Sequence, residues 1–75
     1  MIFDTVREIL ARQLEISPDS IKRDTDIVED LGADSLDMVE FVMAIEEEYD
    51  IVITDERVGS MTTVGQIADF LEKIL

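Results

Sequence analysis

The sequence predicts an all-α fold: a small four-helix bundle with three main helices, one short helix and a long loop between the first two. Apolar residues recur at helical spacing in three separate segments of the chain. The one strand-like run, residues 51–53, is short and has no second strand to pair with, so we expect an extended linker there. At 75 residues the chain is the size of one small domain, and we expect a single domain spanning residues 1–75.

The first predicted helix covers residues near 4–15. Its apolar side follows helical spacing through Phe3, Val6, Ile9, Leu10 and either Gln13 or Leu14. Asp4 is a residue type that caps helix starts, so we expect it at the N-cap. Pro18 disfavours helix at Ser17, and Asp19 suits a turn, so the helix is expected to end before them.

A long connection, residues 16–34, follows the first helix. Its apolar residues stand apart from one another, and we expect them to anchor the loop to the core: Ile16, Ile21, Ile27, Val28 and Leu31. A loop of this length in a compact domain either has a function or contains an element that the pattern has missed. Gly32 is expected to allow a sharp bend before the next helix.

The second predicted helix, Ser35 to Tyr49, has two apolar faces at about 100° per residue. The larger face, Met38, Phe41, Val42, Ile45 and Tyr49, is expected in the core. The smaller face, Leu36, Val39 and Met43, lies nearly opposite, beside Glu40 and Glu47. A domain this small does not easily bury both, so we expect the smaller face to be exposed and to bind other proteins. The alternative is that the other helices cover it too.

The last part of the chain predicts two further helices. A short one is expected to begin at Thr54 or Asp55 and to reach about Ser60. In the final helix Thr63 and Gln66 match a capping box. Its apolar residues at helical spacing are Val64, Ile67, Ala68, Leu71, Ile74 and Leu75.

The net charge of −13 is concentrated in the middle of the chain. Residues 24–56 hold thirteen acidic residues and no basic ones, whereas the segments on either side are balanced. Such a field disfavours nucleic acid and anionic membranes and attracts basic proteins. The alternative is a solvated face that serves solubility alone.

Three features of the sequence indicate the cellular compartment in which we expect the protein. No apolar run approaches the roughly 20 residues of a membrane span, so no membrane insertion is expected. The N-terminal residues lack the pattern of a secretory signal. The absence of cysteine fits a reducing compartment. We therefore expect a cytoplasmic protein.

Ser35 is the candidate functional residue. Either Asp34 or Ser35 could cap the second helix. Hydrolytic catalysis by Ser35 is disfavoured, because the chain has no histidine to act as a base and the neighbouring side chains are carboxylates. A helix N-terminus favours an attached phosphate through its free N–H groups and dipole. Ser35 is therefore either a cap alone or a residue that another protein modifies.

The acidic loop invites comparison with a calcium site. An EF-hand loop opening at Asp24 would need glycine at its sixth position and glutamate at its twelfth, where this chain has Glu29 and Ser35. A loop opening at Asp30 fails at the same two positions. The sequence therefore predicts no dedicated metal site.

The segments VEDLGADSLDMVEFVMAIEEEYDI and TTVGQIADFL resemble the acyl carrier proteins of type II (dissociated) fatty acid synthesis. The resemblance covers essentially the whole chain, and GADSL at residues 32–36 is its most specific part. It implies a non-enzymatic carrier with 4′-phosphopantetheine, delivered from coenzyme A, attached to Ser35. Acyl groups would be carried as thioesters on this arm. Asp34 would help to position the metal ion and substrate of the transferase.

The resemblance also implies partners and binding surfaces. The partners would be a phosphopantetheinyl transferase (holo-carrier synthase), ketoacyl synthases, reductases, a dehydratase and acyltransferases, and the carrier would be a monomer. The implied partner-binding residues are Leu36, Asp37, Val39, Glu40, Met43 and Glu47. The implied acyl pocket is formed by Ile27, Val28, Ala44, Ile45, Ile53, Val58 and Met61. Ordinary core packing is the alternative role for this second set.

Two alternative functions stay open from the sequence. Carriers for polyketide, aminoacyl and lipid-A precursor synthesis share the Asp-Ser-Leu core, although the close match to GADSLDMVE and AIEEEYD favours fatty acids. A small acidic adaptor, which would bind partners through the second helix without modification, is the alternative from a different class.

Overall fold

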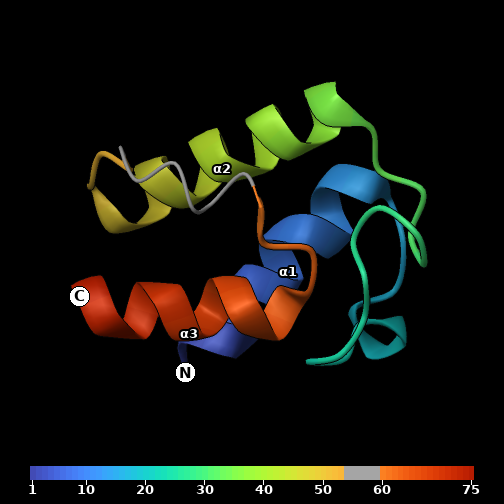
Figure 1. The fold of residues 1–75 in the computed structure, drawn as a ribbon, viewed down its shortest axis with the longest axis horizontal. Coiled ribbons are helices and arrows are strands. Elements are labelled where there is room, and N and C mark those ends of the chain that lie inside the picture. Colours follow the sequence, from blue (N-terminus) through green and yellow to red (C-terminus); the bar gives the residue numbers. More distant parts are fainter. Residues whose placement is uncertain (54–59) are drawn as a thin grey trace.

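The structure is a computed structural model that describes residues 1–53 and 60–75 (Figure 1). Its helices are α1 (Ile2–Leu14), the short 3₁₀ helix η1 (Pro18–Ser20), α2 (Ser35–Tyr49) and α3 (Val64–Ile74). The all-α prediction is confirmed, since the described residues form no strand beyond one isolated bridge between Asp26 and Thr63. The short helix predicted from Thr54 or Asp55 to about Ser60 lies, apart from Ser60, outside the described residues and stays a prediction. None of the described helices is long and apolar enough to cross a membrane.

Helices α2 and α3 both pack against α1. In Figure 1, α2 runs along one side of the molecule and α3 along the opposite side, with α1 behind and between them. α1 contacts both of the other helices, which makes it the common support of the domain. The long loop from α1 to α2, which includes η1, covers one end of this arrangement.

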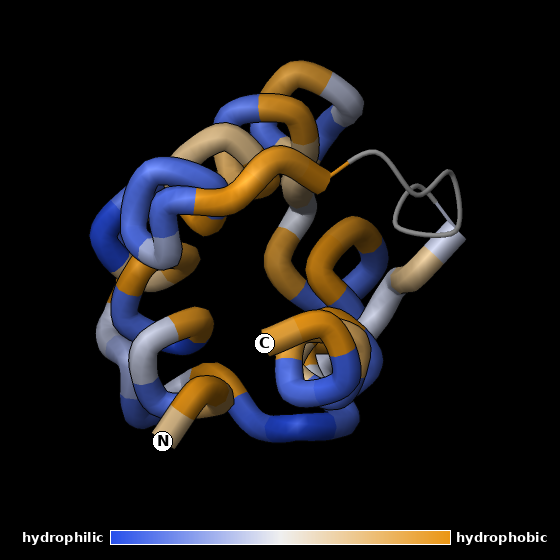
Figure 2. Tube along the Cα trace, turned by 90° about the vertical axis from the view of Figure 1, so that its left-hand side faces the viewer, coloured by the Kyte–Doolittle hydropathy of each residue, from blue (hydrophilic) through white to orange (hydrophobic). Residues whose placement is uncertain are grey.

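The core is built from the apolar sides of the helices and from the loop. Figure 2 shows apolar and polar segments alternating along the chain, as expected for amphipathic helices. Burial of each large apolar side chain contributes about 1.5–3 kcal/mol. The largest fully buried side chains are Val6, Leu10, Ile21, Ile27, Phe41, Ile45, Val64 and Leu71.

The start of α1 differs from the prediction, because Asp4 is not its N-cap. The helix begins at Ile2, and Met1 occupies the cap position without a side-chain hydrogen bond. Asp4 instead lies in the first turn, where its Oδ1 accepts a hydrogen bond from Arg7 at 3.1 Å. A negative charge near the N-terminus of a helix interacts favourably with the helix dipole, so Asp4 stabilises the helix start without capping it.

The long loop is anchored as predicted, with one exception. Ile21 and Ile27 are buried in the core, and Ile16 is partly buried against it, as is Leu31. The prediction for Val28 is wrong, since 46% of this residue is exposed. The Val28 amide begins a turn by donating to the Asp26 carboxylate at 3.0 Å, and this turn leaves the side chain facing solvent.

The same loop docks on the N-terminal end of α3. The amide of Ile27 donates to the carbonyl of Thr62 at 2.8 Å, and the amide of Gly65 donates to the carbonyl of Arg23 at 2.9 Å. A Cβ atom on Gly65 would lie 2.8 Å from that Arg23 oxygen, so only glycine fits without a shift of the backbone. Close contact with α3 thus fixes the loop that leads to Ser35.

The predicted capping box of the last helix is confirmed. Thr63 is the N-cap of α3, and its side chain accepts a hydrogen bond from the Gln66 amide at 3.3 Å. The Gln66 side chain accepts in return from the Thr63 amide at 3.1 Å.

Candidate functional site

Ser35 is the first residue of α2 and is exposed to solvent. Of the two cap candidates, Asp34 occupies the N-cap position, with extended backbone angles of φ −98° and ψ −175°. The Asp34 side chain therefore does the capping, and Ser35 sits at the first helical position beside it.

The turn around Ser35 is held by a reciprocal pair of hydrogen bonds. The amide of Asp37 donates to Oδ1 of Asp34 at 2.9 Å, and the amide of Asp34 donates to Oδ2 of Asp37 at 3.1 Å. This is a capping box with aspartate at both ends. Two of the carboxylates closest to Ser35 in sequence are thus engaged with backbone N–H groups.

The backbone before Ser35 is also fixed. Gly32 has a positive φ of 74°, which confirms the predicted bend. The amide of Ala33 donates to the carbonyl of Ile27 at 3.2 Å, and Ala33 itself is buried. Ser35 therefore lies on the surface but only two residues from the core.

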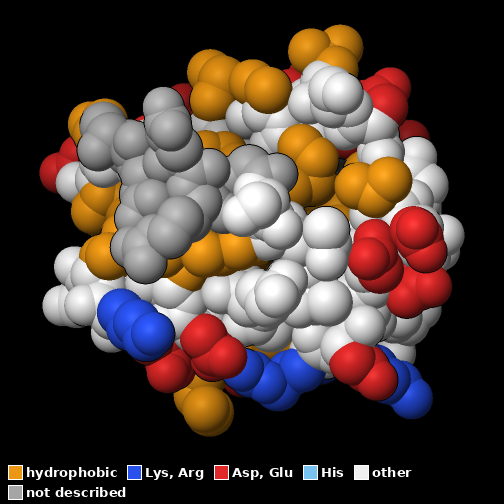
Figure 3. Space-filling view, viewed as in Figure 1, with side chains coloured by type: hydrophobic (Ala, Val, Ile, Leu, Met, Phe, Trp, Pro, Cys, Tyr) orange, Lys and Arg blue, Asp and Glu red, His pale blue; other side chains and the backbone are white. Residues whose placement is uncertain are grey.

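The exposed apolar strip predicted on the second helix is confirmed. Phe41 and Ile45 are buried, whereas Leu36 is 66%, Val39 55% and Met43 56% exposed. Figure 3 shows hydrophobic side chains along the upper edge of the molecule, where α2 runs in Figure 1. We call these three residues, together with the exposed Glu40 and Glu47, the recognition face.

Asp37 differs from the other predicted partner-binding residues. It is only partly exposed, and its carboxylate accepts from the Asp34 amide. Its carbonyl oxygen accepts a hydrogen bond from Nε2 of Gln13 at 2.7 Å. Both interactions hold the start of α2, so the structure gives Asp37 a local structural role beside any contact with partners.

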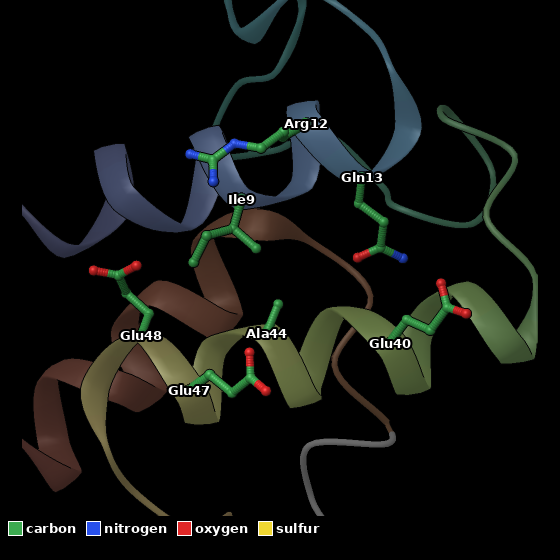
Figure 4. Close-up of a pocket in the computed structure, with 7 residues that line it drawn as sticks. All are labelled: Ile9, Arg12, Gln13, Glu40, Ala44, Glu47 and Glu48. Carbon is green, nitrogen blue, oxygen red and sulfur yellow. The ribbon is translucent and has the colours of Figure 1, made fainter.

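A cleft of about 430 Å³ opens between α1 and α2 (Figure 4). Ile9 and Ala44 provide apolar surface, and the Arg12 side chain extends along α1. Gln13 reaches from α1 toward α2 in the same view. The complete lining is Ile9, Arg12, Gln13, Glu40, Ala44, Glu47 and Glu48.

The predicted acyl-pocket residues do not share one environment. Ile27 and Ile45 are buried in the core, with Ala44, Ile53 and Met61 partly buried against it. Val28 is exposed, and Val58 lies outside the described residues. Ala44 also lines the cleft between α1 and α2, whereas Met61 lines a separate cleft of about 270 Å³ beside α3. The acyl pocket stays a prediction.

Metal-ligating residues do not gather in the part of the chain that is described. Within residues 1–53 and 60–75, no group of three or more carboxylate, histidine or cysteine side chains is placed to hold a metal ion.

Gln13 is the residue that the sequence interpretation missed. Helical spacing places either Gln13 or Leu14 on the apolar side of the first helix and gives Gln13 no role of its own. Its signal was a polar amide at a position whose spacing predicts burial, because partly buried polar groups generally find a hydrogen-bond partner. That partner is Asp37, on the turn that carries Ser35.

The amino-acid sequence matches a known protein family and several curated relatives. A family model described as "Phosphopantetheine attachment site" matches residues 4–71. Curated relatives named acyl carrier protein include one from Sulfurovum sp., 51% identical over 73 residues, covering 97% of both chains. One from Wolinella succinogenes is 46% identical over 71 residues, covering 95% of this chain and 93% of the relative.

A solved structure gives a likeness of fold. The structure of a candidate acyl carrier protein from Mycobacterium tuberculosis superposes with a TM-score of 0.89 and covers 100% of both chains. Its sequence identity to this chain is 24%, so the likeness establishes the arrangement of the helices alone.

Proposed function

This chain belongs to the acyl carrier protein family, and from that membership we propose that it carries growing fatty acyl chains as thioesters on 4′-phosphopantetheine attached to Ser35. The observation that carries the proposal is the position of Ser35: exposed, at the first residue of α2, beside an aspartate that already caps the helix.

The residues around Ser35 suit a phosphodiester. The first N–H groups of an α-helix have no partner within the helix, and the dipole there favours negative charge. The Asp37 amide is taken by the Asp34 carboxylate, but helix α2 also presents the earlier amides of Ser35 and Leu36. The chain has no cysteine, so the thiol for thioester chemistry has to come from the attached group.

The modification divides its chemistry between two proteins. The Ser35 oxygen bonds to the phosphorus that bears the pantetheine of coenzyme A, and the pyrophosphate bond breaks to release adenosine 3′,5′-bisphosphate. The serine proton passes to a base on the transferase, which also supplies the metal ion, because this chain has no histidine to act as that base. When bound, the arm supplies a terminal thiol that forms thioesters. This chain is accordingly a carrier and not an enzyme.

The recognition face is the docking surface for partners. Exposed apolar side chains at its centre favour protein binding, and the surrounding acids attract basic patches. The partners we propose are the phosphopantetheinyl transferase, ketoacyl synthases, reductases, dehydratase and acyltransferases of cytoplasmic fatty acid synthesis, each meeting a monomer of this carrier. Because the attraction is electrostatic, association is expected to slow as salt is added.

The unmodified adaptor is the less favoured alternative, because relatives across nearly the full chain are named acyl carrier proteins. Incubation with coenzyme A and a broad-specificity transferase, followed by intact-mass measurement, separates the two functions. The carrier gains one phosphopantetheinyl group that Ser35→Ala abolishes. The adaptor gains none and binds its partners equally well with that substitution.

A further inference from the structure

The start of α2 is connected to α1 by one short hydrogen bond. Gln13 lies in the last turns of α1, and its partly buried side chain donates from Nε2 to the carbonyl oxygen of Asp37 at 2.7 Å. Asp37 is in the first turn of α2, two residues after Ser35. The bond joins residues 24 positions apart in the chain, so it is a tertiary contact and not part of either helix.

The residue that Gln13 holds also completes the cap of α2. The Asp37 carboxylate accepts from the Asp34 amide, and the Asp34 carboxylate accepts from the Asp37 amide. Gln13 therefore fixes to α1 the same turn that the capping box closes around Ser35. Figure 4 shows its side chain extending from α1 to α2 in agreement with this.

Such a connection matters because the first turn of a helix is its least constrained part. Its N–H groups lack intrahelical partners, and helix ends fray. Leu36, next to Ser35, is largely exposed, so packing of this side chain contributes little to holding the turn. A reacting oxygen whose position is fixed in advance loses less entropy on the way to the transition state.

We propose that Gln13 is a positioning residue for the modification of Ser35: its hydrogen bond to the Asp37 carbonyl fixes the first turn of α2 against α1, so that the serine oxygen has a defined place relative to the recognition face. This inference rests on the proposed function. Gln13 touches neither coenzyme A nor the reacting atoms, and it acts through the backbone of Asp37.

The test compares two variants that remove the donor with one that only lowers stability. Gln13→Ala removes the side chain, and Gln13→Glu keeps its size but replaces the N–H donor with a carboxylate oxygen. We call the hydrogen bond from Gln13 to the Asp37 carbonyl the tether. Ile67→Val is the matched control, because Ile67 is buried on α3 and the loss of one methyl group destabilises the fold without changing the tether. Each protein is modified with coenzyme A and a broad-specificity phosphopantetheinyl transferase, and amide exchange is measured in parallel.

Both Gln13 variants are expected to lower kcat for modification by roughly tenfold while KM stays near the wild-type value, because the recognition face is intact. Exchange of the amides of Asp37 and Met38 is expected to speed up by about tenfold in these variants. Ile67→Val is expected to lower the melting temperature and leave kcat and these two exchange rates unchanged.

Wild-type kcat in both Gln13 variants would overturn the inference, and so would an equal loss of kcat in Ile67→Val. A wild-type protein that accepts no phosphopantetheine would overturn the proposed function instead. The exchange rates would then decide on the tether alone: faster exchange at Asp37 and Met38 in the Gln13 variants would support it, and unchanged exchange would overturn it.

Discussion

Asp34 and Asp37 each hold the backbone of the other across the first turn of α2. Oδ1 of Asp34 accepts from the Asp37 amide at 2.9 Å, and Oδ2 of Asp37 accepts from the Asp34 amide at 3.1 Å. Ser35 lies between them, so the geometry of the proposed attachment residue depends on this pair. The pair also explains how a serine among carboxylates can stand at a helix start: the nearest carboxylates are occupied by N–H groups.

Removal of this cap should cost measurable stability. Asp34→Ala is expected to lower the free energy of unfolding by about 1 kcal/mol, because the Asp37 amide loses its acceptor. Asp34→Asn is the matched control, since its side-chain oxygen can still accept that hydrogen bond, and its loss should be clearly smaller. Urea denaturation of the three proteins measures the differences. Equal losses in the alanine and asparagine variants would mean that the charge, and not the hydrogen bond, stabilises the helix start.

Gly65→Ala should destabilise the protein, although glycine to alanine inside a helix ordinarily stabilises it by about 1 kcal/mol. The new Cβ would lie 2.8 Å from the carbonyl oxygen of Arg23, and that oxygen already accepts a hydrogen bond from the Gly65 amide. We expect a loss of about 1–3 kcal/mol, as for overpacked sites. Thermal unfolding gives the sign directly. An increase in melting temperature would show that the loop at Arg23 moves aside easily.

The recognition face should contribute to docking and little to folding. Val39→Ala on α2 and Val52→Ala in the following linker are a matched pair, because both valines are exposed, at 55% and 80%. The free energy of unfolding of each variant is expected to lie within about 0.5 kcal/mol of the wild-type value. Only Val39→Ala should raise KM of the transferase, by several-fold. Titration of the transferase with each carrier checks this, and equal KM values for the two variants would place the docking surface elsewhere.

Helical spacing was sufficient to predict most of the fold. The predicted Ser35 to Tyr49 helix matches α2, because two separate apolar faces leave little freedom in its register. Thr63 and Gln66 marked the start of α3, because a capping box is a local pattern. The prediction of Asp4 as the N-cap of α1 was wrong, because aspartate suits both a cap and a first turn. Which of the two it occupies depends on where the helix begins.

The contacts between distant segments were not available from local patterns. Spacing places Gln13 on the apolar side of α1 but does not reveal the Asp37 carbonyl that it meets. Val28 and Ile27 are adjacent and both apolar, and only the turn centred on Asp26 decides which one is buried. The role proposed for Ser35 rests on the resemblance to a known family, because residue type and position alone fit a cap equally well.

The attachment of 4′-phosphopantetheine to Ser35 is tested most directly by the mass of the protein after incubation with coenzyme A and a broad-specificity phosphopantetheinyl transferase. Ser20→Ala is the matched control for Ser35→Ala, because Ser20 is also exposed but lies in η1. We predict one added phosphopantetheinyl group on the wild type and on Ser20→Ala, and none on Ser35→Ala. A wild-type protein that stays unmodified, or a Ser35→Ala protein that gains the group, would contradict it.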